Sequence, residues 1–151
     1  MKTWYNENSF GGDLMISRLP IIPRYQETDQ MGIIHHSVYP IWYEMGRVAY
    51  CEAIGLPFHV IEERGIRLAM FDLTSHYIKP TRFGKIYHME TKLIKLSKVR
   101  LTFRYDIYDE SEELVHYGIT ELIWLNKALK PTNIAKTHLD IYQLFEKELV
   151  S

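Results

Sequence analysis

Residue types that could carry out acyl chemistry are concentrated in the segment Tyr25–Tyr39, whose sequence is YQETDQMGIIHHSVY. Within it, Gly32 permits a tight or left-handed turn shortly after Asp29. His35 and His36 follow at the start of a helical pattern, and the first backbone N–H groups of a helix have no acceptor within it. Such groups polarise a carbonyl oxygen and stabilise the negative charge that develops on it. A carboxylate at Asp29 facing that carbonyl could attack it or activate water, which is the chemistry of acyl transfer.

A long amphipathic helix is predicted directly after this segment. Apolar residues recur there with i, i+3, i+4 and i+7 spacing, at Val38, Ile41, Trp42, Met45, Val48 and Ala49. The helix is expected to begin at His36 or Ser37 and to run for about five turns, because Gly55-Leu56-Pro57 is a natural stop. Its first turn would therefore lie beside Asp29.

The remainder of the chain is predicted to consist mainly of strands, which gives an α+β order. Strands are expected over Arg67–Lys79, Ile86–Leu96, Leu101–Tyr108 and Val115–Leu125, with a short helix over Phe58–Arg64 and a last helix over His138–Leu149. Met15–Thr28 contains two prolines, which indicates an edge or irregular strand. Five strands can curl around the one apolar helix and bury it. The other face of the sheet would then need a cover, and a partner subunit is the simplest one.

The alternation of residue types indicates which side chains share a face of a strand. In one strand, Leu101, Phe103, Tyr105 and Ile107 alternate with more polar residues, as in a half-buried strand. In the strand after the charged turn Asp109–Glu113, the apolar residues Val115, Tyr117, Ile119, Ile123 and Leu125 share a face that Glu121 interrupts. On the long helix, Trp42 and Met45 are expected in the core, and Glu44 and Arg47 are expected to form a surface pair.

The composition limits the protein to a few broad classes. The chain has 151 residues and a net charge of −1, without the basic excess typical of general nucleic-acid binders. We expect one domain over residues 1–151, with a loose leader over 1–13 that has no features of a secretory signal. The single cysteine, Cys51, fits a reducing cytoplasm and is expected to be a buried inert thiol. No stretch reaches the roughly 18 to 20 apolar residues that a membrane span needs.

The segment Tyr25–Tyr39, followed by Trp42-Tyr43-Glu44 and Arg47, resembles the opening of the 4-hydroxybenzoyl-CoA thioesterase family of hotdog proteins. Tyr77-Ile78-Lys79-Pro80 resembles the end of that family's second strand, so the resemblance covers most of the chain, from about Leu19 to Leu129. It implies a hotdog fold, in which a five-stranded antiparallel sheet wraps around a long central helix. It also implies hydrolysis of an acyl thioester without a metal or a cofactor. The family assembles as dimers, often paired into tetramers, with active sites at the dimer interface.

The resemblance assigns roles to individual residues. Asp29 matches the catalytic aspartate, as nucleophile or as general base. His36 matches a histidine beside the active site, and a backbone N–H near it would hold the thioester oxygen. The candidate substrate-binding residues are Tyr25, Gly32, His35, Tyr39 and Lys98. Lys98 belongs to a basic cluster that could contact the phosphates of coenzyme A. The sequence departs from the family at Val38, where many members have asparagine.

Other interpretations of the same residues remain open from the sequence. Asp29 alone could be a turn residue, His36 a helix cap, and Lys98 part of a solvated hairpin end. Asp29 with His35 and His36 lacks the HxxxH or HxH spacing of a metal site. The substrate could be an acyl-CoA or an acyl-carrier-protein thioester. A non-catalytic acyl-CoA-binding module and a hydratase or dehydratase are the alternatives to hydrolysis.

Overall fold

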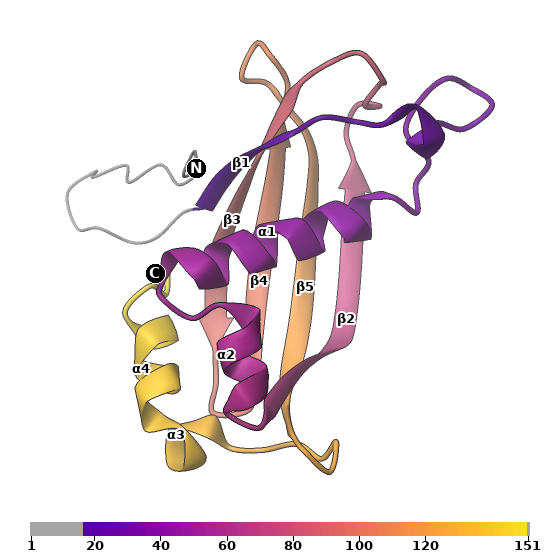
Figure 1. Ribbon diagram of the computed structural model, residues 1–151. Helices are drawn as coiled ribbons and strands as arrows, with labels where there is room; N and C mark the ends of the chain where they lie inside the picture. The colour runs from indigo at the N-terminus through magenta and orange to yellow at the C-terminus, as the bar shows by residue number, and fades with distance from the viewer. Residues whose placement is uncertain (1–16, 151) are drawn as a thin grey trace.

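The computed structural model describes residues 17–150, and these form one antiparallel sheet around a helix (Figure 1). The strands are β1 (Ser17–Ile21), β2 (Ile66–Tyr77), β3 (Tyr87–Leu96), β4 (Arg100–Tyr108) and β5 (Leu114–Asn126). Their order in the sheet is β1-β3-β4-β5-β2, and every neighbouring pair is antiparallel. The helices are α1 (Tyr39–Ala53), α2 (Phe58–Glu63), α3 (Ile134–Thr137) and α4 (Leu139–Glu146), with a 3-10 turn η1 at Tyr25–Glu27.

Helix α1 runs diagonally across the inner face of the sheet, with its N-terminal end over β2 and its C-terminal end on the β3 side (Figure 1). Its backbone lies closest to β1, β3 and β4. Helix α2 packs on β2, and α4 packs on β3. The predicted α+β hotdog architecture is therefore confirmed, with the long helix wrapped by five strands and a helix near the C-terminus.

The inner face of the sheet carries the core, and β4 supplies the residues predicted for it. Leu101, Phe103, Tyr105 and Ile107 are all fully buried. In β5, by contrast, the core-facing residues are His116, Gly118, Thr120, Leu122 and Trp124, which are buried in alternation. The apolar residues from Tyr117 to Leu125 that were expected to share a face do so, but on the outer side of the sheet, where they are only half-buried.

Helix α1 begins two to three residues later than the expected start at His36 or Ser37. Its first residue is Tyr39, its N-cap is Val38, and Pro40 lies in the first turn. Proline disfavours the helical conformation in the residue before it and is tolerated only in the first turn, so it fixes the start here. The helix ends at Ala53, and Gly55 at φ 86° forms the stop that the sequence predicts. His35 and His36 therefore belong to the loop that leads into the helix.

Two predictions for side chains of α1 are wrong, and one is confirmed. Trp42 is buried as expected, whereas Met45 lies on the exposed side of the helix. Arg47 does not pair with Glu44 on the surface; it is only 7% exposed and donates to the Tyr105 hydroxyl at 3.1 Å. The position of Arg47 on the helix turns it toward β4, where the phenol of Tyr105 accepts its hydrogen bond.

The remaining elements follow the predicted order with shifted ends. The irregular first strand is the short β1, and the chain turns into η1 after Pro23. Cys51 is fully buried, and this burial raises the pKa of its thiol to about 12, as expected for an inert cysteine. The leader predicted over residues 1–13 lies outside the described residues. Between residues 17 and 150, no helix is both long and apolar enough to cross a membrane.

Candidate active site

Asp29 begins a five-residue loop that its own side chain closes. Its backbone N–H donates to the carbonyl of Ile33 at 2.8 Å, and its carbonyl accepts from the N–H of Gly32 at 3.1 Å. Carboxylate Oδ1 accepts from the N–H groups of Met31 at 2.8 Å and Ile33 at 3.4 Å. Gly32 has φ 77°, the left-handed conformation predicted for it. Because Oδ2 has no hydrogen-bond donor among the described residues, one oxygen holds the loop and the other is available for chemistry.

The same turn occurs at two other places in the described chain. Oδ1 of Asp109 accepts from the N–H groups two and four residues later at 2.8 and 3.0 Å, and Oδ1 of Asn126 does so at 2.9 and 3.1 Å. The fourth residue of each of these turns, Glu112 or Leu129, has φ 59°. This is a known loop geometry, a turn followed by a left-handed residue. Oδ1 of Asp29 therefore has the same turn-forming role as Oδ1 of Asp109 and Asn126. Any catalytic role of Asp29 must follow from the residues around it.

Glu27 fixes the Asp29 loop to helix α1, a role that sequence reasoning missed. Its side chain is 6% exposed, and Oε1 accepts from the backbone N–H of Arg24 at 2.7 Å. Oε2 accepts from the indole N–H of Trp42 at 3.3 Å and lies 3.5 Å from the Arg24 guanidinium. Its carbonyl accepts from the N–H of His35 at 2.8 Å. The Glu27 carboxylate, two residues before Asp29, thus sets the distance between the Asp29 loop and helix α1.

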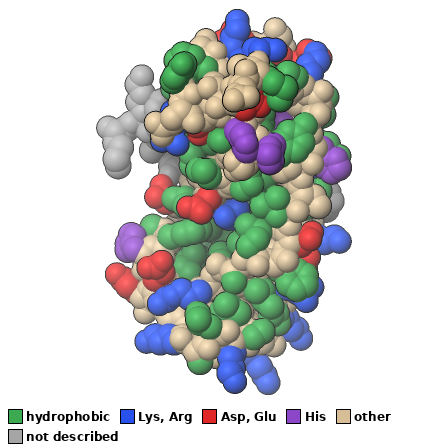
Figure 2. All heavy atoms as spheres, turned by 90° about the vertical axis from the view of Figure 1, so that its right-hand side faces the viewer, with side chains coloured by type: hydrophobic (Ala, Val, Ile, Leu, Met, Phe, Trp, Pro, Cys, Tyr) green, Lys and Arg blue, Asp and Glu red, His purple; other side chains and the backbone are tan. Residues whose placement is uncertain are grey.

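Asp29, His35 and His36 line one open hollow together with Thr28, Gln30 and Met31. The two imidazoles stack with centroids 4.2 Å apart, and Nδ1 of His35 accepts from the backbone N–H of Ser37 at 3.2 Å. Two adjacent histidines are visible on this face of the molecule, above a surface rich in hydrophobic side chains (Figure 2). Within the described residues, the backbone N–H groups of His36 and Tyr39 have no acceptor. These are the donors that a carbonyl oxygen needs at the start of α1.

Tyr39, a predicted substrate contact, is buried behind this hollow. Its hydroxyl is 2.7 Å from Oγ1 of Thr81, and its ring stacks on His116 with centroids 4.0 Å apart. Tyr77 packs edge-on against both rings and donates its hydroxyl proton to the carbonyl of His36 at 2.9 Å. Tyr39 therefore supports the site from within the core, and Tyr77 at the end of β2 holds the histidine loop in place.

His116 is a second residue that sequence reasoning missed. Its Nε2 is hydrogen-bonded to the Tyr43 hydroxyl, which is also 2.7 Å from Oγ of Ser75. Its Nδ1 is buried and has no partner in the described part of the chain. Burial, with a smaller contribution from His76, lowers the pKa of the imidazole to about 4. His116 is therefore neutral at physiological pH and acts as a packing residue under Tyr39.

Lowering the pH is expected to destabilise the protein through His116. Its pKa is about 4 when folded and about 6.5 in an unfolded chain, so the unfolded state binds more protons between these values. The stabilisation is fully present above pH 6.5 and is lost as the pH falls, by about 2 kcal/mol between pH 7 and pH 5. Urea unfolding across this range measures it. His116→Gln is the control, and an unchanged pH dependence in that variant would contradict the assignment.

The other predicted contacts lie at different distances from Asp29. Gly32 is within its loop, whereas Tyr25 is 76% exposed and packs edge-on against Phe83 outside the residues that line the hollow. Lys98 is exposed in the β3–β4 turn. β3 begins near the Asp29 loop and has ten residues, so this turn is roughly 33 Å away. One chain does not bring Lys98 to Asp29, and a contact with coenzyme A at Lys98 stays a prediction that requires a second copy.

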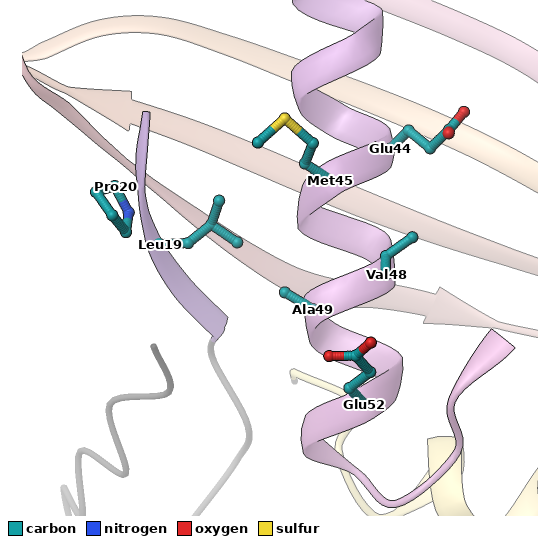
Figure 3. A pocket seen from close by; sticks show the side chains of 7 residues that line it. All are labelled: Leu19, Pro20, Glu44, Met45, Val48, Ala49 and Glu52. Atoms are coloured by element: carbon teal, nitrogen blue, oxygen red, sulfur yellow. The ribbon is translucent and has the colours of Figure 1, made fainter. Parts of the chain in front are cut away.

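A better-enclosed groove of about 480 Å³ lies elsewhere, between β1 and α1. Leu19 points toward Met45 and Ala49 across it, and Glu44 and Glu52 lie on the same helix (Figure 3). The described residues that line it include two carboxylates and no cation, which disfavours the phosphates of coenzyme A. In the part of the chain that the structure describes, no three His, Cys, Asp or Glu side chains gather as metal ligands. The hollow at Asp29 is therefore the candidate active site.

Comparison with known proteins agrees with the hotdog fold. The model of the thioesterase-like superfamily matches residues 23–134. YneP of Bacillus subtilis, provisionally named an acyl-CoA thioesterase, is 30% identical over 133 residues, which cover 87% of this chain and 96% of YneP. The structure of a DHNA-CoA thioesterase from Staphylococcus aureus is 32% identical with a TM-score of 0.83, covering 87% of this chain and 89% of that one.

A more distant relative is the chloroplast acyl-acyl carrier protein thioesterase ATL2 of Arabidopsis thaliana. It is 27% identical over 112 residues, which cover 74% of this chain and 60% of ATL2. The matched region of the family model includes the Asp29 loop, the whole of α1 and all strands except β1. The predicted family is thereby confirmed: the chain belongs to the thioesterase-like superfamily, a hotdog-fold family of thioester hydrolases.

Proposed function

We propose that this protein hydrolyses an acyl-CoA thioester to the free acid and coenzyme A, with Asp29 as the catalytic carboxylate. The observation that carries this proposal is the hollow that Asp29 shares with His35 and His36. Among the described residues, one carboxylate oxygen there is without a donor and the N–H groups of His36 and Tyr39 are without an acceptor. An oxyanion site and a carboxylate on either side of one carbonyl can catalyse acyl transfer.

The reaction follows from these two groups. The N–H groups at the start of α1 bind the thioester oxygen and stabilise the negative charge that forms on it. Asp29 either attacks the carbonyl carbon, forming a mixed anhydride that water then hydrolyses, or removes a proton from an attacking water. In both routes the carbon–sulfur bond breaks and coenzyme A leaves as a thiolate, which needs little acid assistance because thiols have a pKa of about 8.5.

The proposed site is completed by a second copy of the chain. β2 is an edge strand of 12 residues, and it leaves Met70, Phe71 and Tyr77 about half exposed. A long edge strand with exposed apolar side chains is a ready surface for pairing with another chain. We propose a homodimer or homotetramer, and light scattering of the purified protein measures its mass directly.

A panel of thioesters tests the proposed function. Short, long and aromatic acyl-CoAs and an acyl-carrier-protein thioester are mixed with the protein, and release of free thiol is followed. Turnover of a CoA ester supports the proposal. If only the carrier-protein ester were hydrolysed, the substrate would be an acyl-carrier-protein thioester and not an acyl-CoA. Binding of acyl-CoA without release of thiol would instead indicate a non-catalytic module. After single turnover in ¹⁸O-labelled water, label in the Asp29 carboxylate would establish the anhydride route, because an aspartate that acts only as a base keeps its own oxygens.

A further inference from the structure

Among the described residues, Arg47 is a buried cation without a counter-ion. It is 7% exposed, and its Nη1 donates a hydrogen bond to the Tyr105 hydroxyl at 3.1 Å. No carboxylate among the described residues forms an ion pair with it. A guanidinium has five N–H donors and stays charged inside proteins. Burying such a charge without a partner is costly, so an anion or a strong acceptor from outside the chain is expected to offset the cost.

The guanidinium lies at the border of the part of the inner face that α1 leaves uncovered. The Tyr105 hydroxyl that it contacts is 2.6 Å from Oγ1 of Thr120 in β5. Thr120 pairs with Leu73 of the edge strand β2, so the side chains of these two residues lie on the same face. Met70 is paired with the buried Leu122 on that face and is 45% exposed. Arg47 therefore faces a surface whose other wall is apolar and belongs to the free edge of the sheet.

The distance from this surface to the proposed active site follows from the lengths of the helix and the strand. Arg47 is eight residues after Tyr39 on α1, which places it roughly 12 Å along the helix from the N–H groups there. Leu73 is four residues before Tyr77 on β2, or roughly 13 Å from the tyrosine that holds the His36 carbonyl. Estimated along the helix or along the strand, the guanidinium therefore lies roughly 12 to 13 Å from the place where the thioester carbonyl would bind.

We propose that Arg47 binds an oxygen at the far end of the acyl group, so that the enzyme prefers acyl thioesters that carry a terminal carboxylate or another oxygen acceptor. The acyl body would lie against Leu73 and Met70, and its terminal oxygen would accept from the N–H groups of Arg47 that the described residues leave unused. A guanidinium forms strong, directed hydrogen bonds with a carboxylate. A site built to bind an oxygen also rejects the analogue that lacks it, because its donors are then left unpaired.

The proposal rests on the thioesterase activity proposed above, and matched substrates test it. Octanoyl-CoA is compared with the CoA monothioester of octanedioic acid, and benzoyl-CoA with 4-hydroxybenzoyl-CoA. We expect kcat/KM to favour the oxygenated member of at least one pair by tenfold or more. The first pair tests for recognition of a terminal carboxylate. The second pair tests for recognition of a phenol hydroxyl that lies closer to the thioester carbonyl. In Arg47→Met, which removes the charge and keeps an unbranched side chain, the preference should fall at least tenfold.

Further variants separate a substrate contact from a structural role. Leu73→Glu supplies a carboxylate opposite Thr120 and is expected to abolish the preference, whereas Leu73→Gln, of equal size, is expected to retain it. This pair is informative even if Arg47→Met does not fold. Equal losses for both members of a pair in Arg47→Met, or a change in oligomer mass, would show that Arg47 stabilises the fold or the oligomer rather than contacting the substrate, and would overturn the proposal.

Failure of the proposed function and failure of this inference give different results. If no thioester of the panel is hydrolysed, the activity is wrong, but binding of the same four CoA esters measured by calorimetry still reports the preference. If hydrolysis occurs and the oxygenated members are not favoured in turnover or in binding, the role of Arg47 is wrong and the activity stands.

Discussion

Replacing Asp29 by asparagine is expected to lower kcat for thioester hydrolysis about a thousandfold, within the range that a positioned carboxylate contributes as a base. The substitution removes the charge and keeps the shape. The amide oxygen can still accept from the N–H groups of Met31 and Ile33, so the loop should keep its conformation. KM should change little, because the binding groups remain. Release of thiol under saturating substrate, together with thermal unfolding, measures both effects.

The chain contains its own controls for this substitution. Asn126 forms the same five-residue turn with an amide in place of a carboxylate, which shows that asparagine satisfies the geometry. Asp109 forms it with a carboxylate at the β4–β5 turn. Asp109→Asn should therefore retain full activity. If Asp29→Asn were as active as Asp109→Asn, Asp29 would be a turn residue alone and the catalytic assignment would be withdrawn.

The candidate site was predictable from the sequence to the extent that its parts are contiguous. Asp29, Gly32 and the two histidines lie within eight residues, so a single loop brings them together. The groups that hold this loop come from distant parts of the chain, as with Tyr77 on the carbonyl of His36. Their role depends on the closure of the sheet, which no local spacing shows. Glu27 is the one group holding the loop that is close to Asp29 in the sequence. Its role was missed because the sequence does not show that its side chain is buried.

The order of the elements was predictable, but the inner side of β5 was not. A strand shows two alternating faces, and the more apolar one is ordinarily assigned to the core. In β5 the core face contains His116 and Gly118, which lie against the aromatic rings of Tyr39 and Tyr43 from α1. It also contains Thr120, whose hydroxyl is 2.6 Å from that of Tyr105. The start of α1 was displaced by Pro40, whose effect on the preceding residue outweighed the apolar periodicity.

Replacing Gly118 by alanine is expected to lower the free energy of unfolding by about 3 kcal/mol, the upper end of the range for overpacking a core. Adding a methyl group to a glycine in a strand is ordinarily stabilising, because it reduces the entropy of the unfolded chain. Here a Cβ would lie less than 3.0 Å from three atoms of the Tyr43 side chain. The Tyr43 ring cannot easily move, because it stacks on the Tyr105 ring with centroids 4.6 Å apart and its hydroxyl is hydrogen-bonded to Oγ of Ser75.

The sign of the effect therefore depends on the Tyr43 ring, and a double-mutant cycle isolates this dependence. Tyr43→Leu removes the ring and is destabilising by itself, since it leaves a cavity over β5. In that background Gly118→Ala should cost far less than in the natural protein, because the methyl group then fills part of the vacated space. Urea unfolding of the four proteins gives the coupling energy. Equal costs in both backgrounds would show that the strand itself, rather than the tyrosine above it, requires glycine.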